Sequence, residues 1–176
     1  LKECSKLLVS QLSDLEQDWQ ALTLFNYRSE FVALNSSVGL KNILRGLALT
    51  ASEEIAEKAM INPIKSRDPM DEISVFSDNS QMDIVAAVNG LQIIYNGEHA
   101  KSAQTIAPGT SIHDLMLIVD PALEEQVQLK LTELTESVAT IPTPFDWQIA
   151  QEDFGNQGPI MQTAILLYEF ESMMLQ

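Results

Sequence analysis

A cluster of polar side chains comes immediately before one of the helices that the sequence predicts. Residues 72–80 read Glu-Ile-Ser-Val-Phe-Ser-Asp-Asn-Ser, and Asp83 follows three residues later. The free amide groups in the first turn of a helix favour anionic or polar ligands, so the cluster is a candidate binding site. The same side chains could instead act only as a cap of that helix. The local sequence leaves both interpretations open.

The sequence contains no complete catalytic or metal-binding motif. Glu98-His99 and His113-Asp114 are adjacent pairs, and neighbours on a helix point about 100° apart. We therefore predict that both histidines lie on the surface and not in a transition-metal site. The lone cysteine, Cys4, excludes an internal disulfide and a cysteine-based zinc site. No serine-hydrolase elbow, zinc-peptidase helix, Glu-x-x-His motif or phosphate-binding glycine loop is present.

The charge balance excludes two classes of partner. The 176 residues include 10 Lys and Arg against 25 Asp and Glu, which gives a net charge of −15. Nucleic acids and anionic membrane surfaces require a cationic face, so we expect neither as a partner. No apolar run approaches the roughly 18 residues of a transmembrane helix. Because the chain begins with Leu1 and not with Met, we expect that an upstream segment has been removed.

Apolar residues recur every three or four positions along nearly the whole chain, which predicts amphipathic helices. The predicted helical stripes span residues 4–22, 40–59, 84–95, 123–141 and 160–174. No segment alternates with a period of two, so strands are not expected. We predict an all-α fold, an up-and-down bundle of four to five main helices in a single domain over residues 1–176. Trp19 lies on the first stripe, and we predict that it is buried.

The predicted boundaries of the helices rest on local chemistry. Ser80 with Asp83 and Ser111 with Asp114 resemble capping boxes, and Asp120 before a proline is typical of a helix start. A short helix over residues 111–118 is therefore separate from the helix that follows. The connection over residues 62–79 is predicted to be a long loop without regular structure, and loops of this length are often functional. Residues 142–147 are predicted to form a packed corner.

Several of these motifs, taken in order, resemble the imelysin-like family. Residues 72–80 with Asp83 lead into Asn-Gly-Leu-Gln-Ile-Ile-Tyr-Asn-Gly at 89–97, and similar family signatures follow at 111–115, 120–123 and 141–146. The resemblance covers about residues 12–149. Family members have two similar helical halves, and this chain resembles the second. The family's metal-site signature, Gly-x-His-x-x-Glu, belongs to the first half. At the equivalent positions this chain has Gln92 and Tyr95, which are poor metal ligands.

The resemblance implies a bacterial iron-uptake protein, exported to the periplasm or the cell envelope, that binds iron or an iron-bearing ligand in a cleft between its two halves. The partner would be the amino-terminal half of the same protein. Oxygen donors suit a ferric ion, and the candidate residues for this half's wall of the cleft are Glu72, Ser77, Asp78, Ser80, Asp83 and Gln92. No metal site is expected within this chain alone, and no cofactor is identified, although the full-length protein could carry iron. The alternatives are a metallopeptidase, as the family name suggests, and a helical interaction module without a metal.

Overall fold

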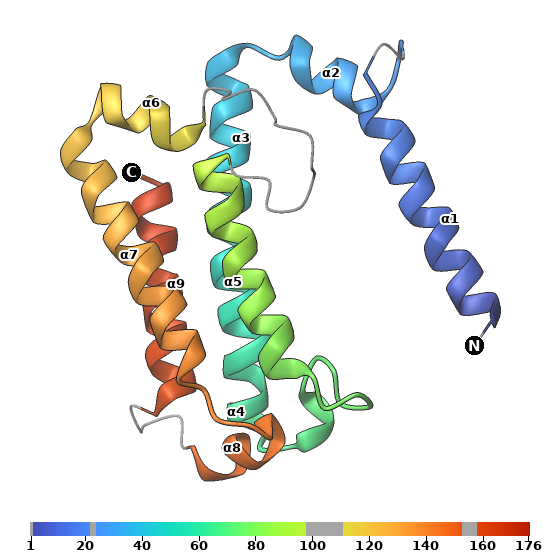
Figure 1. The fold of residues 1–176 in the computed structure, drawn as a ribbon, viewed down its shortest axis with the longest axis vertical. Helices are drawn as coiled ribbons and strands as arrows, with labels where there is room; N and C mark the ends of the chain where they lie inside the picture. The colour runs from blue at the N-terminus through green and yellow to red at the C-terminus, as the bar shows by residue number, and fades with distance from the viewer. Residues whose placement is uncertain (1, 22–23, 98–110, 153–157) are drawn as a thin grey trace. The chain divides into compact units, whose positions relative to one another are not determined.

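The computed structural model describes residues 2–21, 24–97, 111–152 and 158–176, and all regular structure within these ranges is helical. The predicted all-α fold is confirmed. The chain divides into two compact units, residues 1–44 and 45–176. The elements, shown in Figure 1, are α1 (Lys2–Trp19), α2 (Tyr27–Ala33), α3 (Ser36–Leu49), η1 (Thr50–Ile61), α4 (Asn62–Ser66), η2 (Pro69–Asp71), α5 (Ser80–Asn96), α6 (Ile112–Val119), α7 (Pro121–Ala139), α8 (Phe145–Gln151) and α9 (Pro159–Met174).

The second unit is an up-and-down helical bundle. η1 packs against α5 and α9, and α7 packs against the same two helices, so the four elements enclose one core. In Figure 1 the chain descends through η1, rises through α5, descends through α7 and rises through α9. Short connections between antiparallel neighbours are typical of this topology. The predicted bundle is therefore confirmed.

The core of the bundle follows the predicted apolar stripes. α5 buries Ile84, Val88, Leu91 and Tyr95, and α9 buries Ile160, Ala164, Leu167, Phe170 and Met174. α3 continues into η1, a π-helix in which the amide of Asn62 donates to the carbonyl of Glu57, five residues back. π-helical segments usually extend over a single turn, so η1 is unusually long.

Helices begin at or next to all three predicted starts, and two of the three predicted caps are confirmed. The Ser111 hydroxyl accepts from the amide of Asp114 at 2.9 Å, and the Asp114 carboxylate accepts from the amide of Ser111 at 3.0 Å, which completes a capping box. The Asp120 carboxylate caps α7 by accepting from the amide of Leu123 at 3.0 Å. The capping box predicted at Ser80 is wrong, because the Ser80 hydroxyl accepts instead from the amide of Ser74 in the preceding loop, at 3.0 Å.

Both predicted connections contain more regular structure than expected. The prediction of a loop without regular structure over residues 62–79 is wrong in part, because α4 and the 3₁₀ turn η2 occupy the first half of this segment. Pro63 at the start of α4 needs no helical donor, which favours this extra turn of helix. In the second connection, the predicted corner at residues 142–147, α8 begins at Phe145. The Phe145 side chain is 1% exposed and packs into the protein, whereas Trp147 is 56% exposed.

In the first unit, one side chain joins two helices. The Asn26 side chain donates to the carbonyls of Gln17 and Gln20, at 3.2 and 2.9 Å, and accepts from the amide of Ser29 at 3.0 Å. It thereby satisfies carbonyls at the end of α1 and caps α2. Asn26 is buried although it is polar, because these hydrogen bonds replace its contacts with water.

The prediction that Trp19 is buried is wrong. Its side chain is 45% exposed, and no residue of α1 is buried. The ring packs edge-on against Tyr27, with ring centroids 5.2 Å apart, and against Phe31 at 5.9 Å. Aromatic contacts of this kind cover only part of an indole.

Among the described residues, no helix is both long and apolar enough to cross a membrane.

Candidate functional site

The loop before α5 is tied to the first turn of that helix by its own polar side chains. The Ser74 hydroxyl donates to one carboxylate oxygen of Asp83, and the Asn79 amide donates to the other at 2.9 Å. The amide of Ser74 donates to the Ser80 hydroxyl, and Ser80 is fully buried. These bonds hold the loop and the first turn of α5 together. We call residues 72–83 the acidic loop.

Glu72 is the least satisfied member of the acidic loop. Its side chain is buried, with the residue 7% exposed, and its Oε2 has no hydrogen-bond partner among the described residues. Burial raises the pKa of its carboxyl above the ordinary value, a hydrogen bond with the Ser80 hydroxyl partly offsets this, and the negative charges of Asp146 and Asp78 add to the rise. A buried carboxylate oxygen without a partner is costly and is usually retained for a reason.

Ser77 and Asp78 form the exposed turn of the acidic loop. The Ser77 hydroxyl donates to the carbonyl of Ser74 at 3.2 Å. Asp78 has a φ of 50°, in the left-handed region that Asp and Asn tolerate better than most residues. Both side chains face solvent. The structure thus brings five of the six predicted cleft residues, Glu72, Ser77, Asp78, Ser80 and Asp83, into one loop and helix start.

Gln92 does not belong to this group. It lies 12 residues beyond Ser80 on α5, which is about 18 Å along the helix axis. Its side-chain carbonyl accepts from the Thr135 hydroxyl of α7 at 3.5 Å. Gln92 therefore lies away from the acidic loop, where it links two helices of the bundle.

Three exposed apolar side chains lie within the acidic loop or close to it in the sequence. Phe76 is 95% exposed, Met70 is 59% exposed and Ile73 is 49% exposed. Such side chains could provide apolar contacts to an organic ligand or a partner beside the polar groups. The loop therefore offers both oxygen donors and apolar contacts.

A second polar site, which the sequence did not predict, lies where α5, α6 and α7 meet. The Tyr95 hydroxyl donates to Oε2 of Glu124 at 2.5 Å, and Nδ1 of His113 lies 2.5 Å from the other oxygen of Glu124. The Gln128 amide donates to Glu124 and to Asn96, both at 2.8 Å. Glu124 is 1% exposed. The burial of Tyr95, its hydrogen bond to Glu124 and the negative charge of Glu124 together raise the pKa of the Tyr95 hydroxyl well above the ordinary value.

This network corrects the prediction for His113, which is partly buried beside Glu124 and not simply a surface residue. The close contacts of Nδ1 with the Glu124 carboxylate and with the Gln128 amide nitrogen, at 3.2 Å, hold the imidazole ring in one orientation. The signal was present in the sequence, because Glu124 is three residues before Val127 and seven before Leu131, on the buried stripe of α7. Glu98 and His99 lie outside the described residues.

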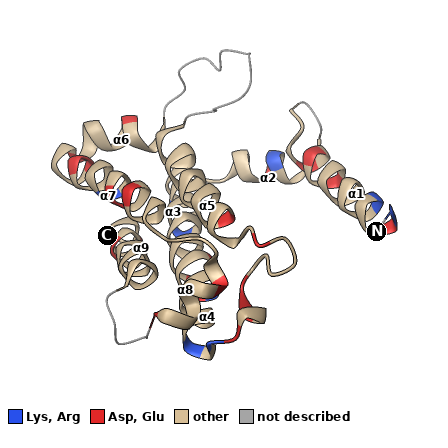
Figure 2. Ribbon diagram, turned by 60° about the horizontal axis from the view of Figure 1, so that its bottom comes forward, with Lys and Arg blue, Asp and Glu red and all other residues tan. Residues whose placement is uncertain are grey.

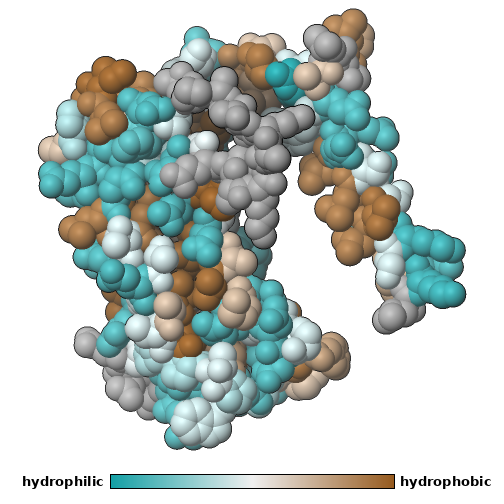
Figure 3. Space-filling view, viewed as in Figure 1, coloured by the Kyte–Doolittle hydropathy of each residue, from teal (hydrophilic) through white to brown (hydrophobic). Residues whose placement is uncertain are grey.

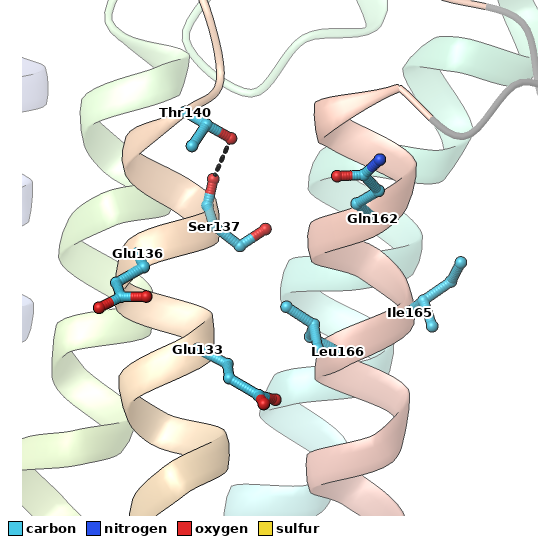
Figure 4. A pocket seen from close by; sticks show the side chains of 7 residues that line it. All are labelled: Glu133, Glu136, Ser137, Thr140, Gln162, Ile165 and Leu166. Atoms are coloured by element: carbon cyan, nitrogen blue, oxygen red, sulfur yellow. Dashed lines mark hydrogen bonds between the residues drawn. The ribbon is translucent and has the colours of Figure 1, made fainter.

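Two pockets on the surface of the described residues can be compared with the acidic loop, and neither is lined by it. One, shown in Figure 4, lies between α7 and α9, with a volume of about 510 Å³. Its lining residues are Glu133, Glu136, Ser137, Thr140, Gln162, Ile165 and Leu166. The other, of about 620 Å³, is lined by Lys58, Asn62, Lys65, Ser66 and Asp71.

Within the described ranges no three His, Cys, Asp or Glu side chains are arranged to hold a metal ion.

The fold and the polar loop define the class of protein, an all-helical bundle with an acidic loop at one helix start. Residues 1–165 match the family model described as imelysin. The match covers well over half of the chain, so this chain belongs to the imelysin family, and the predicted resemblance is confirmed. A search of curated proteins gives no match.

Proposed function

We propose that this chain is one helical half of an imelysin-like iron-uptake protein, and that it binds iron or an iron-bearing ligand in a cleft shared with a second half. The single observation that carries this proposal is Glu72, a buried carboxylate with an unpartnered oxygen beside Asp78 and Asp146. A cation or a polar group of a ligand would satisfy that oxygen and offset the repulsion between the carboxylates.

The donor set favours a site that this chain does not complete alone. A ferric ion or another hard cation takes about six oxygen or nitrogen ligands, and the described residues contain no group of three metal-binding side chains. Tyr95 and Gln92 stand where the family signature has Glu and His, and both are engaged in hydrogen bonds within the bundle. The proposed partner is therefore the amino-terminal half, which would carry Gly-x-His-x-x-Glu.

The surroundings of the loop favour an iron-bearing organic ligand over a bare ion. Exposed Phe76, Met70 and Ile73 provide apolar contact area next to the carboxylates, whereas a bare ion needs only polar ligands. The net charge of −15 raises the local concentration of cationic species. We place the protein in the periplasm or the cell envelope, in keeping with the export that the family resemblance implies.

The proposal is tested by ligand binding to loop variants. Ferric nitrilotriacetate is titrated into this chain purified together with its proposed amino-terminal half, and binding is measured by calorimetry. Glu72→Gln and Asp78→Asn should each raise the Kd at least about tenfold, which corresponds to about 1.4 kcal/mol. Asparagine tolerates the left-handed conformation at position 78, so the helical content should be retained.

The matched control is Glu125→Gln, which removes an exposed carboxylate of α7. It removes the same charge outside the loop and should leave the Kd unchanged. Equal affinities for all four proteins would reduce the acidic loop to a helix cap and refute the proposal. Cleavage of unfolded casein that a chelator abolishes would support the metallopeptidase instead, and neither binding nor cleavage would support the interaction module.

A further inference from the structure

The pocket beside η1 and α4 carries charges of both signs. It has a volume of about 620 Å³, and its lining residues are Lys58, Asn62, Lys65, Ser66 and Asp71. Small-molecule sites typically have volumes of roughly 300–1,000 Å³. Figure 2 shows basic residues at α4, and in Figure 3 the end of the bundle that carries α4 and α8 has a largely hydrophilic surface. The pocket therefore suits a small, charged ligand.

Four of the lining residues come from the continuous rod that η1 and α4 form. Lys58, Asn62 and Lys65 are four and three positions apart, and Ser66 follows directly. Residues three or four positions apart are neighbours on the surface of a helix. The rod therefore presents two ammonium groups and one amide to the same pocket.

The two lysines keep hydrogen-bonding capacity for a ligand. Lys58 pairs with Glu54, and Lys65 pairs with Glu57 at 2.9 Å, but neither glutamate lines the pocket. The side chains of these pairs are between 38 and 60% exposed, and exposed ion pairs are weak. An ammonium group has three donors, so each lysine can bind a ligand without leaving its glutamate.

Asp71 supplies the opposite charge from η2. α4 ends at Arg67, whose φ of 55° turns the chain back. The Ser66 hydroxyl accepts from the amide of Asp68 at 3.2 Å, and the Asp68 carboxylate accepts from the amide of Met70 at 2.9 Å. These bonds hold η2 beside α4. Within the described part of the chain, the Asp71 carboxylate makes no hydrogen bond or ion pair.

We propose that this pocket binds a polar α-amino acid as its zwitterion. The α-carboxylate accepts from the ammonium groups of Lys58 and Lys65, and the α-ammonium donates to Asp71, in charge-assisted hydrogen bonds. The Asn62 amide both donates and accepts, which matches an amide in the side chain of the ligand. Asp71 repels a simple anion and the lysines repel a simple amine, so the lining selects a ligand that carries both charges. The proposal does not depend on the acidic loop or on iron.

Calorimetric titration of the intact chain with L-glutamine measures the binding. Glutaramate lacks the α-ammonium and γ-aminobutyramide lacks the α-carboxylate, and each should bind at least about tenfold more weakly than glutamine. Failure of glutamine to bind at millimolar concentration would overturn the proposal. Equal affinities for glutamine and glutaramate would also overturn it, because the pocket would then be an anion site.

Two variants assign the binding to this pocket. Lys58→Gln and Asp71→Asn should each raise the Kd for glutamine at least about tenfold. In Asp71→Asn the preference for glutamine over glutaramate should also disappear, because the charge that distinguishes them is gone. Both residues are exposed, and far-UV circular dichroism should show unchanged helical content.

The matched control is Lys6→Gln, which removes an exposed lysine that pairs with Glu3 on α1 at 2.9 Å. It removes the same charge and the same kind of ion pair outside the pocket, and it should bind glutamine like the wild type. Wild-type affinity in Lys58→Gln and Asp71→Asn would place the binding elsewhere and overturn the proposal.

Discussion

Replacing Glu72 by glutamine should stabilise the chain in the absence of ligand. The wild-type carboxylate is buried, one of its oxygens has no partner among the described residues, and Asp78 and Asp146 repel its charge. An unsatisfied buried polar group costs about 1–3 kcal/mol, and an amide at this position is uncharged and can donate to carboxylates. We therefore expect Glu72→Gln to raise the free energy of unfolding at neutral pH by about 1–3 kcal/mol, with a rise in Tm of about 2–4 °C per kcal/mol.

The pH dependence provides a second measurement of the same effect. The pKa of Glu72 is raised in the folded state, so the folded state binds the proton more tightly than the unfolded state does. Stability is therefore lost as the pH rises from the ordinary carboxyl pKa through the raised pKa, and the penalty is absent below this window. The difference in stability between Glu72→Gln and the wild type should grow with pH across the window and vanish at its acidic end.

The assay is urea unfolding followed by far-UV circular dichroism at a series of pH values. Glu125→Gln is the control, because Glu125 is exposed, and its effect should stay within about 0.5 kcal/mol. A loss of stability in Glu72→Gln, with no dependence on pH, would refute the reasoning. Glu72 would then be a satisfied structural residue and not a carboxylate reserved for a ligand.

Three further predictions concern other parts of the bundle. Tyr95→Phe removes the hydrogen bond to the buried carboxylate of Glu124 and should lower the free energy of urea unfolding by about 1–3 kcal/mol. Gly158→Ala should destabilise the start of α9, because an added Cβ would lie 2.3 Å from Cδ of Glu152. The carboxylate oxygens of Glu152 accept from the first amides of that helix. The free energy of unfolding, measured by thermal unfolding, should fall by about 1 kcal/mol. Burial and a hydrogen bond to a carboxylate raise the pKa of Tyr168 to about 12, so ultraviolet titration should find it ionising later than a free tyrosine, and its contribution to stability should be lost as the pH rises from 10 to 12.

Each of these three predictions has a result that would contradict it. Wild-type stability for Tyr95→Phe would mean that the charge of Glu124 is satisfied without the phenol. An unchanged Tm for Gly158→Ala would mean that the Glu152 side chain can move aside without loss. Ionisation of every tyrosine near the ordinary pKa would mean that Tyr168 does not keep its hydrogen bond in solution.

The bundle could be predicted because its helices obey local rules. The stripes of α5 and α9 are continuous in the sequence, and the caps at Ser111 and Asp120 involve residues within three positions of each other. The exposure of Trp19 could not be predicted, because periodicity indicates which face of a helix is apolar but not what covers it. The role of Ser80 depends on Ser74, six residues earlier, which lies outside any capping motif.

The acidic loop was predictable because its members are neighbours in the sequence. Gln92 was assigned to the same cleft through its place in the family repeat, and the helix rise separates it from the loop. The network of Tyr95, His113 and Glu124 joins three helices, and a contact between distant residues leaves no spacing pattern to detect. Only the position of Glu124 on an apolar stripe pointed to it.

The π-helical segment η1 affects how the chain tolerates changes in length. Its amides reach back five residues, one more than in an α-helix, as Asn62 does to Glu57. Removing one residue from η1 would let a turn revert to α-helical bonding while the flanking helices keep their orientation. The same deletion in α7 would rotate every later side chain by about 100° and turn Leu134 and Val138 away from the core. Natural length variation in this bundle should therefore concentrate in η1.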